Sequence, residues 1–293
     1  RFVARVLGTV WPKLRGVDRR LRAGRYEFPL GEKWTVILGA FITGRTDDEY
    51  LAVPEGYTIA AIAQVAHRAL GMDSAAFVAV TRQPEFRERL EVPAGVGIVE
   101  GYLFPATYRV PPDAEPQQLV AQMVRGFLTV WDTAWDRLAQ DSLGMTRHEV
   151  VTLASIVEAE ARVARERPLI AGVYLNRLRR RTPMRLEADP TVIYALGAPV
   201  RRVLFRHLRI ASPYNTYLHY GLPPGPIASP GRASILAVLH PARHPYLFFV
   251  ARPDGTHMFS RTAGEHVDSV AVARRLRAEW VATHDTAQSA PRP

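Results

Sequence analysis

The chain has 293 residues, of which 47% are hydrophobic and 23% are charged. This is a globular composition, and it excludes a wholly disordered chain, a collagen-like repeat and a coiled-coil rod. The formal net charge of +10 favours anionic partners such as nucleic acid, a membrane surface or an acidic polymer, without choosing among them. The absence of cysteine excludes disulfide scaffolds, thiolate zinc sites and cysteine nucleophiles.

The first 113 residues predict a basic arm followed by small α/β units. Residues 1–22 are rich in arginine and form either a solvated arm or a segment beside an anionic membrane face. Strand patterns occur at 25–28 and 51–53, and each precedes a turn and a helix. These helices are expected over 35–43 and from the N-cap residue Thr58 to Leu70, with two more over 75–80 and 84–90.

The rest of the chain predicts a helix-rich domain. Helices are expected over 115–140, twice within 146–181, and over 265–283, with strands at 246–250 and 257–259. The predicted fold class is therefore α+β. Its divisions are an arm (1–22), a small α/β N-terminal region (23–113), a mixed helix-rich α+β domain (114–285) and a disordered tail (286–293).

The segment 146–167 contains the most informative pattern. Thr146 and Glu149 have the spacing of a capping box, so a helix begins there. At about 100° per residue from Leu153, Glu160 falls at about −20°, in the middle of the apolar arc, and Glu158 at about 140°, on its flank. Burial raises the pKa of a carboxyl, and a carboxylic acid held near neutral pH can act first as general acid and then as general base.

The pattern alone leaves alternatives open. Glu160 could instead form a salt bridge with Arg165 or Arg177, and Glu158 could be a solvated surface residue. Asp189 either caps the apolar segment that follows it or contacts a ligand. Loops at 213–217 and 221–227 are dense in Pro, Gly, Asn, Thr and Tyr, which suits carbohydrate hydroxyls and structural turns equally.

Motifs for metal and phosphate chemistry do not occur. The sequence has no zinc-helix motif, no phosphate-binding glycine loop and no nucleophile-elbow serine. We therefore expect neither a metal nor a cofactor.

Several segments, taken in chain order, resemble the endolytic murein transglycosylases, the YceG-like proteins. They are residues 100–108 (EGYLFPATY), 154–160 (ASIVEAE), 166–178, 184–194 (MRLEADPTVIY), 214–217 (YNTY), 221–227, 240–241 and 257–259. Two positions depart from the family pattern. Ala159 replaces a common lysine, and Glu187 replaces a frequent glutamine, so its carboxylate could alter the local field or pair with Arg185.

The resemblance implies a bacterial enzyme of the cytoplasmic membrane, facing the cell wall and held by one N-terminal helix outside this sequence. It implies a LysM-like N-terminal region, endolytic cleavage between N-acetylmuramic acid and N-acetylglucosamine with 1,6-anhydro ends, and peptidoglycan synthases as partners. The family's essential glutamate is placed at Glu160, with Glu158 as the fallback. The residues expected to bind the glycan are Asn176, Arg185, Asp189, Thr191, Asn215, Thr216 and Tyr217.

Two other classes of protein remain as alternatives. The first is a noncatalytic glycan-binding protein of the cell wall. The second is a basic nucleic-acid-binding protein, which only the net charge suggests. Because no nucleic-acid reading motif is present, we expect no nucleic acid partner.

Overall fold

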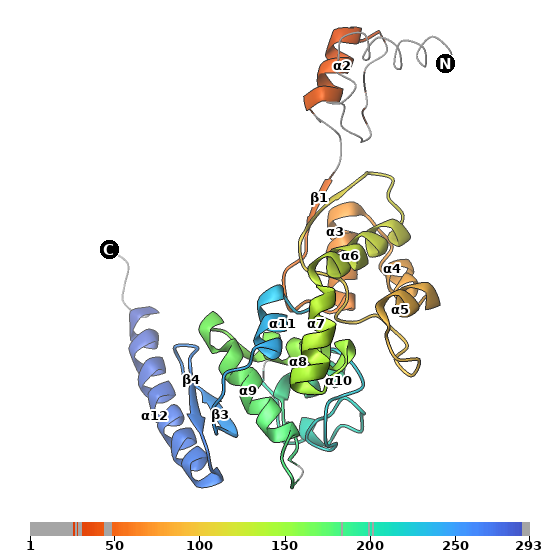
Figure 1. Ribbon diagram of the computed structural model, residues 1–293. Coiled ribbons are helices and arrows are strands. Elements are labelled where there is room, and N and C mark those ends of the chain that lie inside the picture. Colours follow the sequence, from red (N-terminus) through yellow and green to blue (C-terminus); the bar gives the residue numbers. More distant parts are fainter. Residues whose placement is uncertain are drawn as a thin grey trace.

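The computed structural model describes residues 26, 28, 31–43, 49–182, 184–198, 200 and 202–288 (Figure 1). Helices dominate it, and the strands form two small antiparallel sheets, which confirms the α+β class. Within these residues, no helix combines the length and the apolar character that crossing a membrane requires. The predicted arm, residues 25 and 27 of the strand pattern at 25–28 and the end of the tail lie outside the described residues.

The N-terminal part contains one of the two sheets. β1 (Glu49–Ala52) pairs antiparallel with β2 (Thr107–Val110), and Leu51 lies opposite Tyr108. The helices of this part are α2 (Trp34–Thr43), α3 (Ile59–Leu70), α4 (Ser74–Val80) and α5 (Pro84–Leu90). The predicted helices are thus confirmed to within a residue or two, whereas the LysM-like character and the domain boundaries stay predictions.

Local capping explains where α3 begins and ends. The hydroxyl of Thr58 accepts a hydrogen bond from the amide of Ala61 at 3.1 Å, as expected of an N-cap threonine. Gly71 ends the helix at φ 66°, a left-handed conformation that glycine adopts without a steric penalty.

The single helix predicted over 115–140 is wrong in length. The chain forms α6 (Pro116–Val130), α7 (Thr133–Leu138) and the π-helical turn η2 (Ala139–Leu143). Asp132 caps α7 by accepting a hydrogen bond from the amide of Ala134 at 2.8 Å. Because the apolar positions Trp131 and Trp135 continue the period across this break, periodicity does not reveal it.

The second part is built around α8 (Arg147–Glu160), which packs against α9 (Arg167–Leu178), α10 (Asp189–Leu196) and α11 (Arg232–Leu239) (Figure 1). The capping box is confirmed, because Glu149 accepts a hydrogen bond from the amide of Thr146 at 2.8 Å and the reciprocal bond is present. Every residue from 150 to 157 is buried. The last three residues of α8, from 158 to 160, therefore follow a fully buried stretch of helix.

The C-terminal part closes the fold with the second sheet. β3 (Phe248–Ala251) pairs antiparallel with β4 (His257–Ser260), and α12 (Ala263–Gln288) lies alongside them (Figure 1). Both predicted strands and the last helix are confirmed, although α12 continues into the stretch predicted as tail. A single turn, η3 (Ala164–Glu166), precedes α9, and another, η4 (His207–Arg209), lies in the long loop before α11.

Candidate active site

Glu158 and Glu160 lie in the last turn of α8 but have different environments. The side chain of Glu158 is only 7% exposed, so the expectation of a solvated residue is wrong. Its carboxylate accepts hydrogen bonds from Arg167 at 3.0 Å, from the hydroxyl of Ser234 at 2.8 Å and from the amide of Gly231 at 3.0 Å. Glu158 therefore ties α8 to α9 and α11.

The carboxyl of Glu160 points toward α9 and has few partners. It accepts one hydrogen bond, from the hydroxyl of Tyr174 at 3.0 Å. It forms no ion pair with Arg165, Arg177 or any other residue of the described chain. The residue as a whole is partly exposed, while protein surrounds the carboxyl itself. Glu160 is therefore a partly exposed residue with a poorly hydrated carboxyl.

Loss of hydration raises the pKa of Glu160 from 4.5 to about 7. Smaller effects act on the same pKa: the hydrogen bond from Tyr174 lowers it, the charge of Asp189 raises it and the guanidinium of Arg177 lowers it. At neutral pH both protonation states of the carboxyl are populated. A group that first donates and later accepts a proton needs this property.

Helix α9 supplies Tyr174 and Arg177 beside this carboxyl. Burial raises the pKa of Tyr174 well above 10, and the adjacent Glu160 raises it further, so the phenol remains a hydrogen-bond donor. Arg177 donates to the backbone carbonyls of Leu186 and Leu247, both at 2.6 Å, and burial lowers its pKa. It therefore fixes the backbone around the site.

Two of the predicted glycan-binding residues flank the carboxyl. Asp189 is exposed and accepts a hydrogen bond from the hydroxyl of Tyr217 at 2.7 Å. Burial raises the pKa of Tyr217, and the charges of Asp189 and Glu160 add to that effect, so the three groups share one electrostatic environment. The N-cap of α10 is Ala188, which contradicts the alternative that Asp189 caps this helix.

Thr191 and Thr216 are close neighbours in the sequence of Asp189 and Tyr217, respectively. Both are buried, and their hydroxyl oxygens lie 2.9 Å apart. The hydroxyl of Thr216 also accepts a hydrogen bond from the amide of Ala188 at 3.0 Å. The two threonines therefore join the 215–217 loop to the start of α10.

Asn215 has a similar bracing position. Its amide group donates to the carbonyls of Leu208 and Ile210, both at 3.0 Å, and its carbonyl accepts from the amide of Tyr217 at 3.0 Å. The residue is fully buried. Asn215 thus positions Tyr217 and the loop before it, and its polar atoms face protein.

Asn176 and Arg185 lie further from the carboxyl. The amide of Asn176 donates to the carbonyls of His244 at 2.7 Å and Tyr246 at 3.0 Å. The guanidinium of Arg185 lies 4.8 Å from the centre of the Tyr220 ring. It forms no ion pair with Glu187, so Glu187 acts through the local field instead, raising the pKa of Tyr217 and Arg177.

Tyr174 is the residue that sequence reasoning missed. It belongs to the buried stripe of α9, and nothing in its spacing distinguishes it from a core tyrosine. Its role follows only from the packing of α9 against the end of α8.

Among the described residues, no three His, Asp or Glu side chains converge as a metal site requires.

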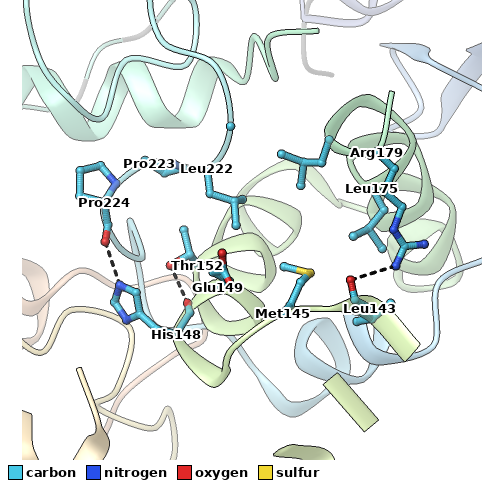
Figure 2. A pocket seen from close by; sticks show the side chains of 12 residues that line it. Leu143, Met145, His148, Glu149, Thr152, Leu175, Arg179, Leu222, Pro223 and Pro224 are labelled. Carbon is cyan, nitrogen blue, oxygen red and sulfur yellow. Dashed lines mark hydrogen bonds between the residues drawn. The ribbon is translucent and has the colours of Figure 1, made fainter. Parts of the chain in front are cut away.

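A separate hollow of about 440 Å³ lies at the other end of α8 (Figure 2). His148 lines it. Its Nε2 donates to the carbonyl of Pro224 at 2.8 Å, so its Nδ1 accepts from the hydroxyl of Tyr102 at 2.9 Å. Glu149 also lines it, about 16 Å along the helix axis from Glu160. This hollow is therefore distinct from the carboxyl site.

Comparison with known proteins places the chain in a family. The profile of the YceG-like family matches residues 3–272. The chain belongs to the YceG-like family. The structure of a yceG-like protein, lmo1499 of Listeria monocytogenes, superposes with a TM-score of 0.68 at 32% identity, covering 88% of this chain and 87% of that one.

Two relatives of this chain carry the name endolytic murein transglycosylase. The protein of Bacillus subtilis strain 168 is 41% identical over 169 residues, which is 57% of this chain and 46% of the relative. The protein of Streptococcus pneumoniae serotype 2 is 30% identical over 281 residues, which is 86% of this chain and 50% of the relative. The chain thus spans about half the length of these relatives.

Proposed function

We propose that this protein is a lytic transglycosylase that cuts peptidoglycan strands internally, between N-acetylmuramic acid and N-acetylglucosamine. The observation that carries the proposal is the contrast within one helical turn. Glu158 accepts hydrogen bonds from Arg167, Ser234 and Gly231, while Glu160 has no ion pair, accepts only one hydrogen bond and has a pKa of about 7. The names of the relatives support the substrate class.

The proposed reaction needs only one carboxyl group. Protonated Glu160 donates its proton to the glycosidic oxygen, and the bond from that oxygen to the anomeric carbon of muramic acid breaks. The resulting carboxylate takes the proton of the muramic acid 6-hydroxyl, whose oxygen bonds to the anomeric carbon. The products are a free 4-hydroxyl and a 1,6-anhydro end, and Glu160 regains its proton. Glycosidases that use water need a second carboxylate.

The neighbouring groups set the conditions for this reaction. The Tyr174 hydroxyl stabilises the carboxylate form after the first proton transfer, and Asp189 favours the protonated form before it. Tyr217 and Asp189 border the opening and orient the sugar. Thr191, Asn215, Thr216 and Asn176 hold the loops that present them. Arg185 remains proposed as a glycan contact at the edge of the site.

The proposed setting is the outer side of the bacterial cytoplasmic membrane, with a single anchoring helix outside this sequence. The proposed substrate there is the peptidoglycan strand, and peptidoglycan synthases are the proposed partners. No cofactor has a part in this reaction.

The decisive experiment compares Glu160→Gln with Glu158→Gln on purified peptidoglycan, with products read by mass spectrometry. We expect Glu160→Gln to lower the formation of anhydro-muropeptides by a factor of about 10² to 10⁴, because the general acid is lost. Glu158→Gln keeps its hydrogen bonds from Ser234 and Gly231 and should retain activity once folded. Circular dichroism checks that both variants are folded.

An active Glu160→Gln protein together with an inactive, folded Glu158→Gln protein would move the catalytic role to Glu158. If the parent binds glycan strands but releases no anhydro product, the protein is instead a glycan-binding module.

A further inference from the structure

A groove of about 460 Å³ adjoins the candidate active site. Asp189 belongs to both, because it accepts the hydrogen bond from Tyr217 beside Glu160 and also lines the groove. The rest of the lining comes from the 202–208 segment of the long loop between α10 and α11. A polymer bound across Glu160 can therefore continue into this groove.

The rim of the groove carries an unusual apolar surface. Phe205 is 89% exposed and its neighbour Leu204 is 40% exposed. An exposed aromatic ring at the edge of a cleft is a typical binding feature, because a ligand that covers it removes apolar surface from water. The apolar face of a pyranose ring, with its axial C–H groups, fits such a ring.

Two exposed arginines border the same groove. Arg202 and Arg206 form no ion pair with any residue that the structure describes, and the Nε of Arg206 lies 3.3 Å from a ring nitrogen of His207. A guanidinium group binds a carboxylate through two parallel hydrogen bonds. The lining also contains Asp189, which repels a carboxylate, so a bound carboxylate is favoured beside the arginines.

Hydrogen bonds to its backbone hold the 202–208 segment in place. Asn215 donates to the carbonyls of Leu208 and Ile210, and His207 accepts a hydrogen bond from the amide of Leu204 at 3.2 Å. Because these bonds fix the backbone, Phe205 and the arginines are presented before a ligand arrives. Preorganisation of this kind lowers the entropic cost of binding.

We propose that the 202–208 segment forms a subsite for the part of the peptidoglycan strand next to the cleaved bond. Phe205 stacks on a sugar ring, and Arg202 and Arg206 bind a carboxylate of the peptide attached to muramic acid. This inference rests on the proposed function, and it adds that the enzyme distinguishes strands that carry peptide from strands that lack it.

The test measures binding to purified glycan strands with and without their peptides, in the uncleaving Glu160→Gln background. We expect Phe205→Ala to weaken binding of both kinds of strand about tenfold, through loss of the stacked ring. The double variant Arg202→Ala/Arg206→Ala should weaken binding of peptide-bearing strands about tenfold and leave peptide-free strands unchanged. Matched controls are Tyr50→Ala on β1 and Arg274→Ala/Arg275→Ala on α12, all at exposed positions.

If both groove variants bind the strands as tightly as the Glu160→Gln protein does, the subsite proposal is wrong. It is also wrong if the Glu160→Gln protein binds no strands at all. An equal loss on both kinds of strand in the arginine variant would contradict recognition of the peptide. Cleavage by the parent protein is measured separately, so failure of the proposed function appears as a lack of anhydro product and is not confused with failure of the subsite.

Discussion

At the scale of single residues, identical side chains acquire different chemistry from their partners. Glu158 and Glu160 lie two positions apart. Glu158 accepts three hydrogen bonds, of which the one from Arg167 is also an ion pair, whereas Glu160 accepts one hydrogen bond. Charge-assisted hydrogen bonds favour a carboxylate, whereas burial without them favours the neutral acid. The proposed proton donor is therefore the glutamate that the fold leaves without an ion pair.

The pH dependence of cleavage should report the protonation of Glu160. Because the acid form starts the reaction, kcat/KM should fall as pH rises through about 7. Tyr174→Phe removes a hydrogen bond that lowers this pKa, so the falling limb should move to higher pH. Asp189→Asn removes a charge that raises the pKa, so the limb should move to lower pH. If the falling limbs of the two variants do not move in opposite directions, the assignment of Glu160 as the general acid is wrong.

At the scale of elements, the site depends on how closely α9 approaches the loop that leads to β3. The ring of His244 donates from Nε2 to the carbonyl of Leu169 at 2.9 Å, since its Nδ1 accepts from the amide of Tyr246. The amide of Ala242 donates to the carbonyl of Pro168 at 3.0 Å. This contact holds the helix that presents Tyr174 to Glu160.

Gly172 makes that approach possible. A Cβ atom there would come within 2.5 Å of the carbonyl oxygen of Ala242 and within 2.6 Å of the His244 ring. We expect Gly172→Ala to lower the free energy of unfolding by about 1–3 kcal/mol, because α9 must move away from the loop. Gly39→Ala is the matched control: it lies in α2 with nothing within 4 Å of its Cβ, and should gain up to about 1 kcal/mol.

Chemical denaturation of both variants measures the difference. An unchanged denaturation midpoint for Gly172→Ala would show that the loop moves away from α9 without a loss of stability. Activity should also fall in this variant, since Tyr174 moves with α9.

At the scale of the whole molecule, Glu100 connects the N-terminal part to the second part. Its buried carboxyl accepts hydrogen bonds from the amide of Ile59, at the start of α3, and from the hydroxyl of Tyr194 on α10. Backbone bonds between Gly56 or Tyr57 and Ser229 reinforce the same junction. Burial, opposed by these hydrogen bonds, raises the pKa of Glu100 to about 7.

A raised carboxyl pKa makes stability depend on pH. The folded state holds this proton more tightly than the unfolded state, so the contribution is complete below pH 4.5 and is lost as pH rises through about 7. Glu100→Gln cannot ionise, so its free energy of unfolding relative to the parent should rise by the order of 2 kcal/mol from pH 5 to pH 8. Thermal unfolding at the two pH values measures this.

Glu88→Gln, at an exposed position, provides the matched control for the loss of one carboxyl. The same difference between Glu100→Gln and the parent at pH 5 and pH 8 would contradict the raised pKa of Glu100.

The sequence by itself determined the features that depend on neighbours a few residues away. The cap at Thr58 and the capping box at Thr146 are local patterns, and the structure has them as expected. The order of the motifs was enough to indicate the family, which the profile match then confirmed.

Only the tertiary structure decided which groups meet. The hydrogen bond from Tyr174 to Glu160 joins two helices. The hydrogen bonds of Asn215 and Glu158 join segments that no shared sequence pattern connects. The break at Asp132 also escaped prediction, because the apolar pattern continues through it. The physical reason is that burial and charge are properties of surroundings, and packing brings those surroundings from distant parts of the chain.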